Sequence, residues 1–358
     1  MRSHIVKLGS LVVLAAWGLQ GKVAHSQEGS ASGGVQVHMV ITNEAVQDGT
    51  DIAVLKPERV QVKQGKNALK VTQVIPAQGD NAGLQLFILI DDTCDSSIGN
   101  NLTDIRNFVS GLPTTTAVAI GYMSNANVQI TQDFTTDHSQ AVKAIRLPRG
   151  SLSASDSPYL SLISLVKRWP QQKVRREVIM VSDGIDRLRG ARESGSTPYT
   201  GSRSNRNVYG DSMANRNPYS APLSPAGMAT MSPDVDSASM TSQRYGVIVH
   251  GIYSPGVGRV GRNGWEAQLG QSGVGKIADE TGGEYFALGT QNAVSFKPYL
   301  DRLQKVFDNQ YYLVFQAVPG KKPGLQRVKI STDTANTEIA AADNVWVPVT
   351  NEASNSGN

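Results

Sequence analysis

The stretch LQLFILIDDTCDSS, residues 84–97, decides the fold of this chain. Its first half, 84–90, is a near-continuous apolar run, which is typical of a central strand buried on both faces. The acidic and hydroxyl-bearing side chains that follow begin at Asp91. Ligands of open α/β sheets bind outside the carboxyl ends of the strands, so this second half is the first candidate for a functional site.

Outward from this stretch, strand patterns alternate with helix patterns, which predicts an α/β fold with a mostly parallel central sheet. A helix expected at 101–112 carries its apolar side chains on one stripe. The segments 59–64 and 68–74 are expected to pair as a hairpin around Gly65. Further strands are expected at 35–42, 117–122, 127–133, 177–182, 245–252, 311–317, 325–331 and 344–347, and further helices at 137–146, 158–168, 274–281 and 294–309.

Length and composition limit the classes of protein that this chain can belong to. Its 358 residues are 39% hydrophobic and 18% charged, enough for a large core that needs no disulfide or metal to fold. The single cysteine, Cys94, excludes an intramolecular disulfide framework, a cysteine-based zinc site and a cysteine-ligated iron–sulfur cluster. Five scattered histidines argue against a histidine-built metal centre.

The first 26 residues have the pattern of a secretory signal peptide. Arg2 and Lys7 precede the apolar run 8–19, and Ala24-His25-Ser26 has the form of a cleavage site. The run is too short to span a bilayer, and no later segment is long enough either. Cleavage removes three cationic and no acidic residues, which lowers the net charge of +4 by three, to +1. We therefore expect an exported protein, periplasmic or extracellular, without a membrane-spanning segment and without a role in nucleic-acid binding.

One region interrupts the alternation of strands and helices. Residues 190–243 are rich in Ser, Asn, Arg, Gly, Pro and Tyr and show no sustained apolar period. So long a polar insertion is unusual in a compact domain, and it is either a mobile surface loop or a binding loop. The insertion begins shortly after Asp183-Gly184. If it is a binding loop, we expect it to cover or extend the candidate site.

Three strand-to-helix loops supply oxygen ligands for a cation. The predicted ligands are Asp91, Thr93, Asp95, Ser157 and Asp183. Carboxylates and hydroxyls are hard ligands that suit Mg²⁺, Ca²⁺ or Mn²⁺. Each of these residues taken alone is better explained as a helix cap. Their order after the expected strands favours a shared site.

These motifs, taken in order, resemble the von Willebrand factor type A (VWFA) domain with its metal-ion-dependent adhesion site. Asp91-Asp92-Thr93-Cys94-Asp95 is similar to the family's Asp-x-Ser-x-Ser loop, Ser157-Pro158-Tyr159-Leu160 to its Thr-Pro-Leu-Tyr helix start, and 178–184 to its strand ending in Ser-Asp-Gly. Residues 277–283 resemble its Ala-x-x-Thr-Gly-Gly segment, and 310–315 the strand after its last helix. The flanking segments resemble the secreted bacterial subfamily of VWFA-related acidobacterial domains.

The resemblance implies a Rossmann-like three-layer sandwich with extra β segments at both ends. It divides the chain into a signal peptide 1–26, a flexible leader 27–34, an N-terminal β segment 35–80, a VWFA-like domain 81–318 with the insertion 190–243, a C-terminal β segment 319–350 and a disordered tail 351–358. It also implies a metal bound by the five predicted ligands, with Mg²⁺ expected first and Ca²⁺ or Mn²⁺ as alternatives, and a partner that offers a carboxylate.

The chain departs from the family pattern at two ligand positions. Thr93 keeps the hydroxyl of the family's first Ser, but Asp95 replaces the second Ser with a carboxylate. The added charge weakens the pull of the metal on a partner's carboxylate or favours Ca²⁺, and a degenerate, metal-free site is the alternative. The other register, Asp92-x-Cys94-x-Ser96, sets a soft thiol against a hard cation and is the poorer match.

Three other features have simple structural interpretations. Cys94 is expected to be a small buried apolar residue, with a redox-sensitive thiol as the alternative. The segments 256–261 and 270–276 match glycine-rich phosphate-binding patterns, but the first is not followed at once by a helix pattern and the second is not preceded by a strand. His138 and His250 have no nucleophile partner in the sequence.

The sequence thus predicts an exported, non-enzymatic binding or adhesion module that contacts a protein or the extracellular matrix through a metal-organised site. Two alternatives remain at this stage. One is a nucleotide-binding or hydrolytic enzyme that uses the acidic loop or the glycine patterns. The other is a metal-free structural module of an envelope assembly.

Overall fold

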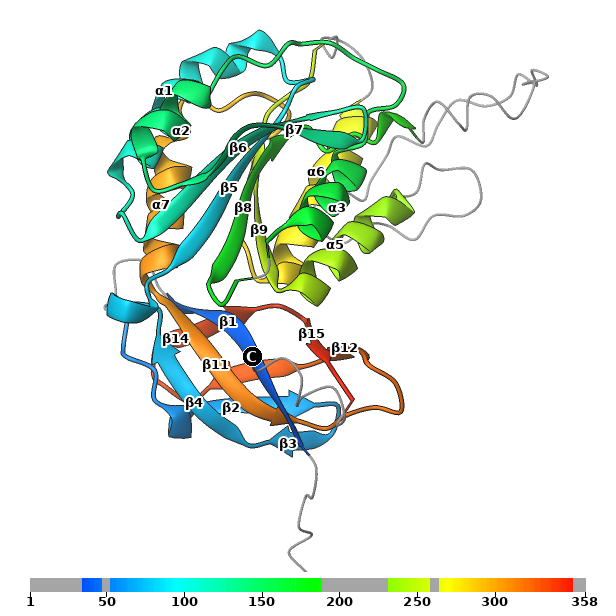
Figure 1. Cartoon of the computed structure of the whole chain (residues 1–358). Helices are drawn as coiled ribbons and strands as arrows, with labels where there is room; N and C mark the ends of the chain where they lie inside the picture. The colour runs from blue at the N-terminus through cyan, green and yellow to red at the C-terminus, as the bar shows by residue number, and fades with distance from the viewer. Residues whose placement is uncertain (1–33, 47–51, 171, 189–230, 258–263, 350–358) are drawn as a thin grey trace, which may run out of the picture. The chain divides into compact units, whose positions relative to one another are not determined.

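The computed structural model describes residues 34–46, 52–170, 172–188, 231–257 and 264–349. The expected signal peptide, the leader up to residue 33, the part 190–230 of the insertion and the tail 351–358 lie outside the described residues. Helices and strands are labelled as in Figure 1.

The expected α/β sheet is present and has the strand order β10-β9-β8-β5-β6-β7. All its neighbouring strands are parallel except the pair of β6 with the edge strand β7. The strands are β5 (Leu84–Asp91), β6 (Thr116–Ser124), β7 (Asn127–Thr135), β8 (Arg175–Ser182), β9 (Val247–Tyr253) and β10 (Tyr285–Phe286).

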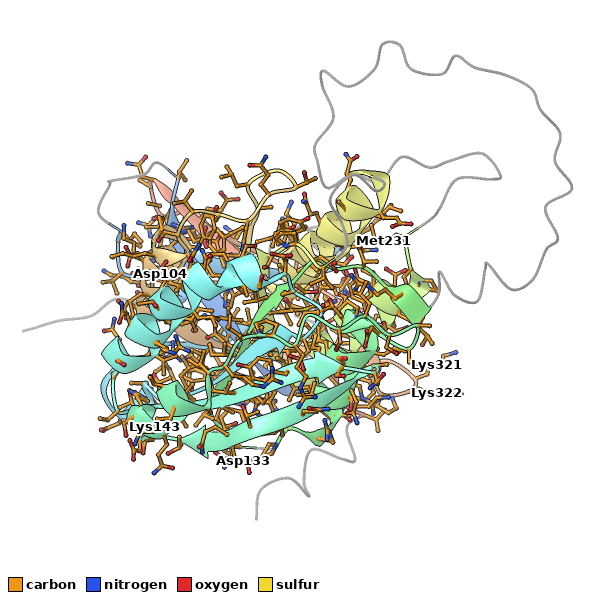
Figure 2. All side chains as sticks on the ribbon, turned by 90° about the horizontal axis from the view of Figure 1, so that it is seen from above. Asp104, Asp133, Lys143, Met231, Lys321 and Lys322 are labelled. Atoms are coloured by element: carbon orange, nitrogen blue, oxygen red, sulfur yellow. The ribbon has the colours of Figure 1, made fainter. Side chains whose placement is uncertain are left out.

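Helices cover both faces of this sheet (Figure 1). The helices are α1 (Gly99–Gly111), α2 (His138–Ala144), α3 (Pro158–Arg168), α5 (Pro233–Tyr245), α6 (Gly264–Thr281) and α7 (Lys297–Asp308). The continuous apolar run of β5 is explained by burial on both faces. Leu86 and Ile88 pack into the core with α1 and α7, whereas Phe87 and Leu89 pack into the core with α3 and α5. In Figure 2, Asp104 of α1 and Met231, just before α5, lie on opposite sides of the molecule.

A second β region joins the two ends of the described chain. Its four-stranded sheet has the order β14-β1-β11-β4, all antiparallel, with smaller sheets β13-β2-β3 and β12-β15. The strands are β1 (Val35–Ala45), β2 (Val60–Gln64), β3 (Asn67–Leu69), β4 (Val71–Pro76), β11 (Gln310–Ala317), β12 (Gly324–Arg327), β13 (Lys329–Thr332), β14 (Thr337–Ala341) and β15 (Asn344–Val347). The β segments predicted at the two ends of the chain therefore share one core, which is built on residues such as Ile41, Leu313 and Val347.

Two strand predictions are corrected here. The segment 68–74 is divided between β3, which pairs with β2, and β4, which pairs with β11. Strand β11, predicted within the domain 81–318, lies in the second β region, where β1 and β4 flank it. Its apolar side chains suit either sheet, so the pattern did not distinguish the two partners.

Two helix predictions are also corrected. Residues 233–243, assigned to the polar insertion, belong to α5, whose first turn is capped by Ser232 and whose end is formed by Gly246 in a left-handed conformation. Its mostly polar and small side chains hid its short apolar stripe. Helix α6 begins ten residues before the predicted start at 274. Among the described residues, no helix is long and apolar enough to cross a membrane.

Candidate functional site at the carboxyl end of the sheet

The predicted loops meet because their strands are neighbours. β5 ends at Asp91 and pairs in parallel with β8, which ends at Ser182 immediately before Asp183. Parallel strands present their carboxyl ends at the same edge of a sheet, so Asp91 and Asp183 lie close enough for their charges to interact. We call this edge, with the loops 91–98, 145–157, 183–188 and 285–296 that line it, the carboxyl edge.

The Asp91 carboxylate is buried and held by the chain's own donors. Its Oδ1 accepts bonds from the Thr93 amide at 3.0 Å and the Thr93 hydroxyl at 2.8 Å, and its Oδ2 accepts one from the Ser182 hydroxyl at 2.7 Å. Burial and the negative charge of Asp183 raise the pKa of Asp91 to about 6. Thr93 thus keeps the hydroxyl that the prediction needs, directed at Asp91.

The Asp183 carboxylate is paired with a residue that the sequence analysis did not consider. Its Oδ1 accepts a bond from the Ile185 amide at 2.8 Å, and its Oδ2 lies 2.7 Å from Nη2 of Arg187. The side chain of Asp183 is 0% exposed and that of Arg187 is 15% exposed, so this is an ion pair in the interior. The available signal was an arginine four positions after the aspartate.

The main chain fixes Arg187 in this place. The amides of Arg187 and Leu188 both donate to the carbonyl of Asp156, at 2.9 and 3.0 Å. Burial lowers the pKa of the guanidinium, but the charge and hydrogen bond of Asp183, with smaller contributions from Asp91 and Asp156, outweigh it and raise that pKa overall. Arg187 therefore stays charged among three aspartates.

Asp92 forms a second ion pair, at the base of the loop 145–157. Nη1 and Nη2 of Arg146 contact the two oxygens of Asp92 at 2.7 and 3.0 Å, and the Arg149 amide donates to Oδ1 at 3.0 Å. The Arg146 guanidinium also lies 3.6 Å from the centre of the Tyr122 ring. This fork-to-carboxylate geometry orders the loop over the motif.

Asp95 and Ser157, the remaining two predicted ligands, serve as helix caps. Asp95 accepts a bond from the Ser97 amide at 2.9 Å and begins the short 3-10 helix η3 (Ser96–Ile98). Ser157 caps α3, where its hydroxyl accepts a bond from the Leu160 amide at 3.4 Å. The capping interpretation therefore accounts for these two side chains.

The backbone of the next loop closes over the Asp183–Arg187 pair. A Cβ atom added at Gly256 would lie 2.3 Å from Oδ2 of Asp183 and 2.8 Å from Nη2 of Arg187. A larger residue at 256 would therefore require the Asp183 carboxylate or the Arg187 guanidinium to shift. The glycine required here belongs to the pattern 256–261, of which 258–261 lie outside the described residues.

Cys94 is buried beneath the same loop. Burial and the charges of Asp91 and Asp183 raise the pKa of its thiol well above the usual range. Its sulfur lies 3.9 Å from the Val181 carbonyl and 4.0 Å from that of Ser254, so it is a packed side chain. This agrees with the expectation of a small buried residue and does not favour a reactive thiol.

The other motifs carry no site of the kind that their patterns suggest. The segment 270–276 lies inside α6, where the backbone amides are in helical bonds and do not form a phosphate-binding loop. His250 is fully buried in β9: its Nε2 lies 2.8 Å from Oε2 of Glu177, and its Nδ1 accepts a bond from the Glu284 amide at 3.0 Å.

The arrangement of the five predicted ligands does not fit a divalent cation as it stands. Asp183 is paired with a guanidinium, and Asp95 and Ser157 are engaged as caps. The described part of the chain holds no group of three or more His, Cys, Asp or Glu side chains placed to bind a metal. Asp91, Thr93 and Asp183 do come together, with the guanidinium of Arg187 at Asp183.

Comparison with known proteins adds little to this description. No protein-family profile matches the sequence, and none of the curated proteins does. An aerotolerance-related membrane protein from Bacteroides fragilis, with multiple mutations to serine, is 12% identical with a TM-score of 0.39, over 63% of this chain and 99% of that one. The SpRpn10 VWA domain is 9% identical with a TM-score of 0.33, over 61% and 94%.

Human COPII-coat protein Sec24c is 8% identical with a TM-score of 0.38, over 74% of this chain and 44% of that one. All three scores are low, so none of these likenesses supports an argument about function. The α/β assignment therefore rests on the sheet order and the two helical layers of this chain.

Proposed function

We propose that this chain is an exported, non-catalytic protein-interaction module of the VWFA type, and that it binds its partner with the carboxyl edge. The order of the motifs 91–95, 157–160 and 178–184 supports the family. The pattern of residues 1–26 supports export. The engagement of Asp91, Asp92 and Asp183 by donors of their own chain supports a binding role over acid–base catalysis.

One observation carries the proposal: large apolar side chains are exposed on two loops of the carboxyl edge. Leu147 and Leu152 lie on the loop that the Asp92 pair orders, and Leu288 and Val294 lie on the loop between β10 and α7. Their exposure ranges from 52% to 92%. A contiguous patch of exposed apolar side chains is typical of a protein-binding surface, and we propose that these four side chains contribute to one.

Hydrogen bonds tether the second loop to the first motif. Nδ2 of Asn101, in the first turn of α1, donates to the Ala293 carbonyl at 3.0 Å, and Nδ2 of Asn292 lies 3.2 Å from Oγ of Ser97. The Tyr253 hydroxyl, at the end of β9, donates to the Thr290 carbonyl at 3.4 Å. The apolar side chains are thus presented on a braced loop, which lowers the entropy cost of binding.

The test compares two double variants of the full chain as baits for proteins of the envelope and the medium. Leu147→Asp with Val294→Asp changes the carboxyl edge, whereas Val54→Asp with Met240→Asp changes apolar residues elsewhere that are also more than half exposed. We expect both to keep the wild-type Tm, because exposed positions tolerate charge. The edge variant should lose at least tenfold in captured partner and the control none. Equal capture by both variants would contradict the proposal.

A second candidate is the metal-organised version of the same module. The geometry that favours it is the pair of hydroxyls, Thr93 and Ser182, at the buried Asp91 carboxylate. In this version Asp91, Thr93, Asp95, Ser157 and Asp183 would hold Mg²⁺, or Ca²⁺ or Mn²⁺, and a partner carboxylate would complete the coordination. A rise in wild-type Tm with these ions, reversed by chelator, is its expected signature. A metal-free structural role in an envelope assembly remains the third interpretation.

A further inference from the structure

We infer that Arg187 is the built-in cation of the carboxyl edge: its guanidinium takes the place of a divalent ion, and its removal uncovers a divalent-cation site on Asp91 and Asp183. This inference concerns the edge of the proposed function but not the partner. Its readout is metal binding, so its failure would leave the proposed interaction standing, and the reverse also holds.

A buried carboxylate requires a positive charge close to it. Asp183 is 0% exposed, and an interior carboxylate without a nearby cation strongly destabilises the fold. Asp91 is buried beside it, so the demand for positive charge at this point is greater than for a lone aspartate. Among the described residues, the guanidinium at 2.7 Å from Asp183 Oδ2 is the cation that these two carboxylates share.

Backbone groups pack around this guanidinium and hold it in place. The amide of Arg187 is bonded to the Asp156 carbonyl, and its Nη1 lies 3.4 Å from the Ile185 carbonyl. The backbone at Gly256 packs against both members of the pair, because a Cβ there would lie 2.3 Å from Oδ2 of Asp183 and 2.8 Å from Nη2 of Arg187. A surface side chain that met Asp183 by chance would not have backbone contacts on two sides.

Two of the other predicted ligands are engaged in hydrogen bonds outside the site. The side-chain oxygens of Asp95 and Ser157 accept hydrogen bonds from the amides of Ser97 and Leu160. These two predicted metal ligands are therefore already engaged as helix caps. Asp91, Thr93 and Asp183 remain together. The two carboxylates that remain together, Asp91 and Asp183, are the ones that interact with the charge of Arg187.

The experiment titrates MnCl₂ into the full chain and follows the paramagnetic resonance of free Mn²⁺, alongside thermal unfolding with and without chelator. The wild type should bind no Mn²⁺ at about millimolar concentration, and its Tm should not respond. Arg187→Ser should bind one Mn²⁺ per chain, at least tenfold more tightly than the wild type. Its Tm should fall in chelator and recover in Mn²⁺.

Two matched variants separate charge from shape. Arg187→Lys keeps a positive charge and should gain no Mn²⁺ binding, although it loses the planar fork. Arg187→Ser combined with Asp183→Asn lacks an essential ligand and should lose the gained binding. If Arg187→Ser unfolds in chelator, refolding in MnCl₂, followed by circular dichroism, replaces the Tm readout.

Two results would overturn the inference. One is stoichiometric Mn²⁺ binding by the wild-type chain. The other is an Arg187→Ser chain that neither binds Mn²⁺ when folded nor regains its fold in MnCl₂.

Discussion

The two ends of the six-stranded sheet each bury an arginine, but they use it differently. At the amino end, Arg175 begins β8 and donates to the carbonyls of Phe307 and Ala82 at 2.8 Å and to Oε1 of Gln310 at 2.7 Å. At the carboxyl end, Arg187 pairs with Asp183. The partners of Arg175 are neutral groups on neighbouring elements, whereas the partner of Arg187 is an acid in its own loop.

Two arginines tie the amino end of the sheet to the second β region. Gln310 is the first residue of β11, so Arg175 ties the parallel sheet to the second β region. Arg302 of α7 makes a second tie, with contacts to Glu44 of β1 at 3.1 Å and to Glu284 at 2.8 Å. The amino end is thus tied to the second β region and also holds a cavity of about 630 Å³ lined by residues such as Gly83, Arg176 and Val247, whereas the exposed apolar loops lie at the carboxyl end.

The largest expected effect tests the amino end. Arg175→Met should lower the free energy of unfolding by about 3 to 5 kcal/mol, because it leaves three acceptors without their donor and each buried unpaired group costs about 1–3 kcal/mol. Urea unfolding measures the loss, which Mn²⁺ should not change. Arg59→Met, in an exposed ion pair with Asp333, is the control and should cost under about 1 kcal/mol. Equal losses in the two variants would remove the distinction between a buried tie and a surface pair.

The next effect tests how tightly the carboxyl edge is packed. Gly184 has φ +70°, and a Cβ there would lie 2.2 Å from the Gly270 carbonyl oxygen, whereas Gly65 has φ +61° with nothing within 4 Å. Gly65→Ala should therefore cost about 1 kcal/mol for the left-handed backbone alone. Gly184→Ala should cost about 2 to 5 kcal/mol, because the clash adds to it. Similar Tm values for the two variants would show that this loop moves away from α6 without penalty.

The smallest effect is a pH dependence at the tie between β1 and α7. Burial, with the negative charge of Glu284, raises the pKa of Glu44 above 4.5, and Arg302 only partly offsets this. A carboxyl whose folded pKa is raised stabilises the fold below its unfolded pKa, and that contribution is lost as pH rises through the folded pKa. Glu44→Gln should therefore gain stability relative to the wild type between pH 4 and pH 7, as measured by urea unfolding.

The exposed Glu58, on the 3-10 helix η1 (Pro57–Arg59), provides the matched control for this measurement. Glu58→Gln should track the wild type across the same range. A stability difference for Glu44→Gln that falls with pH would mean that Arg302 dominates the site, and the tie would then resemble the Asp183 pair.

The sequence predicted the central strand and most of its neighbours because their patterns are local. An apolar run such as 84–90 can be satisfied only between two layers, and it is. It also predicted that Asp91, Thr93 and Asp183 meet, because parallel strands align their carboxyl ends. It missed α5, whose apolar stripe is short, and it placed β11 in the wrong sheet, because antiparallel and parallel partners accept the same side chains.

What the sequence determined by itself is that Asp91, Thr93 and Asp183 stand at the carboxyl edge, since their positions after apolar strands follow from the hydrophobic pattern. What the tertiary structure decided is which charges satisfy one another there. Asp95 and Ser157 turn to helix amides, and Arg187 reaches Asp183. The reason is physical: a buried carboxylate takes whatever positive charge the packed chain brings within hydrogen-bond distance, and that distance exists only after folding.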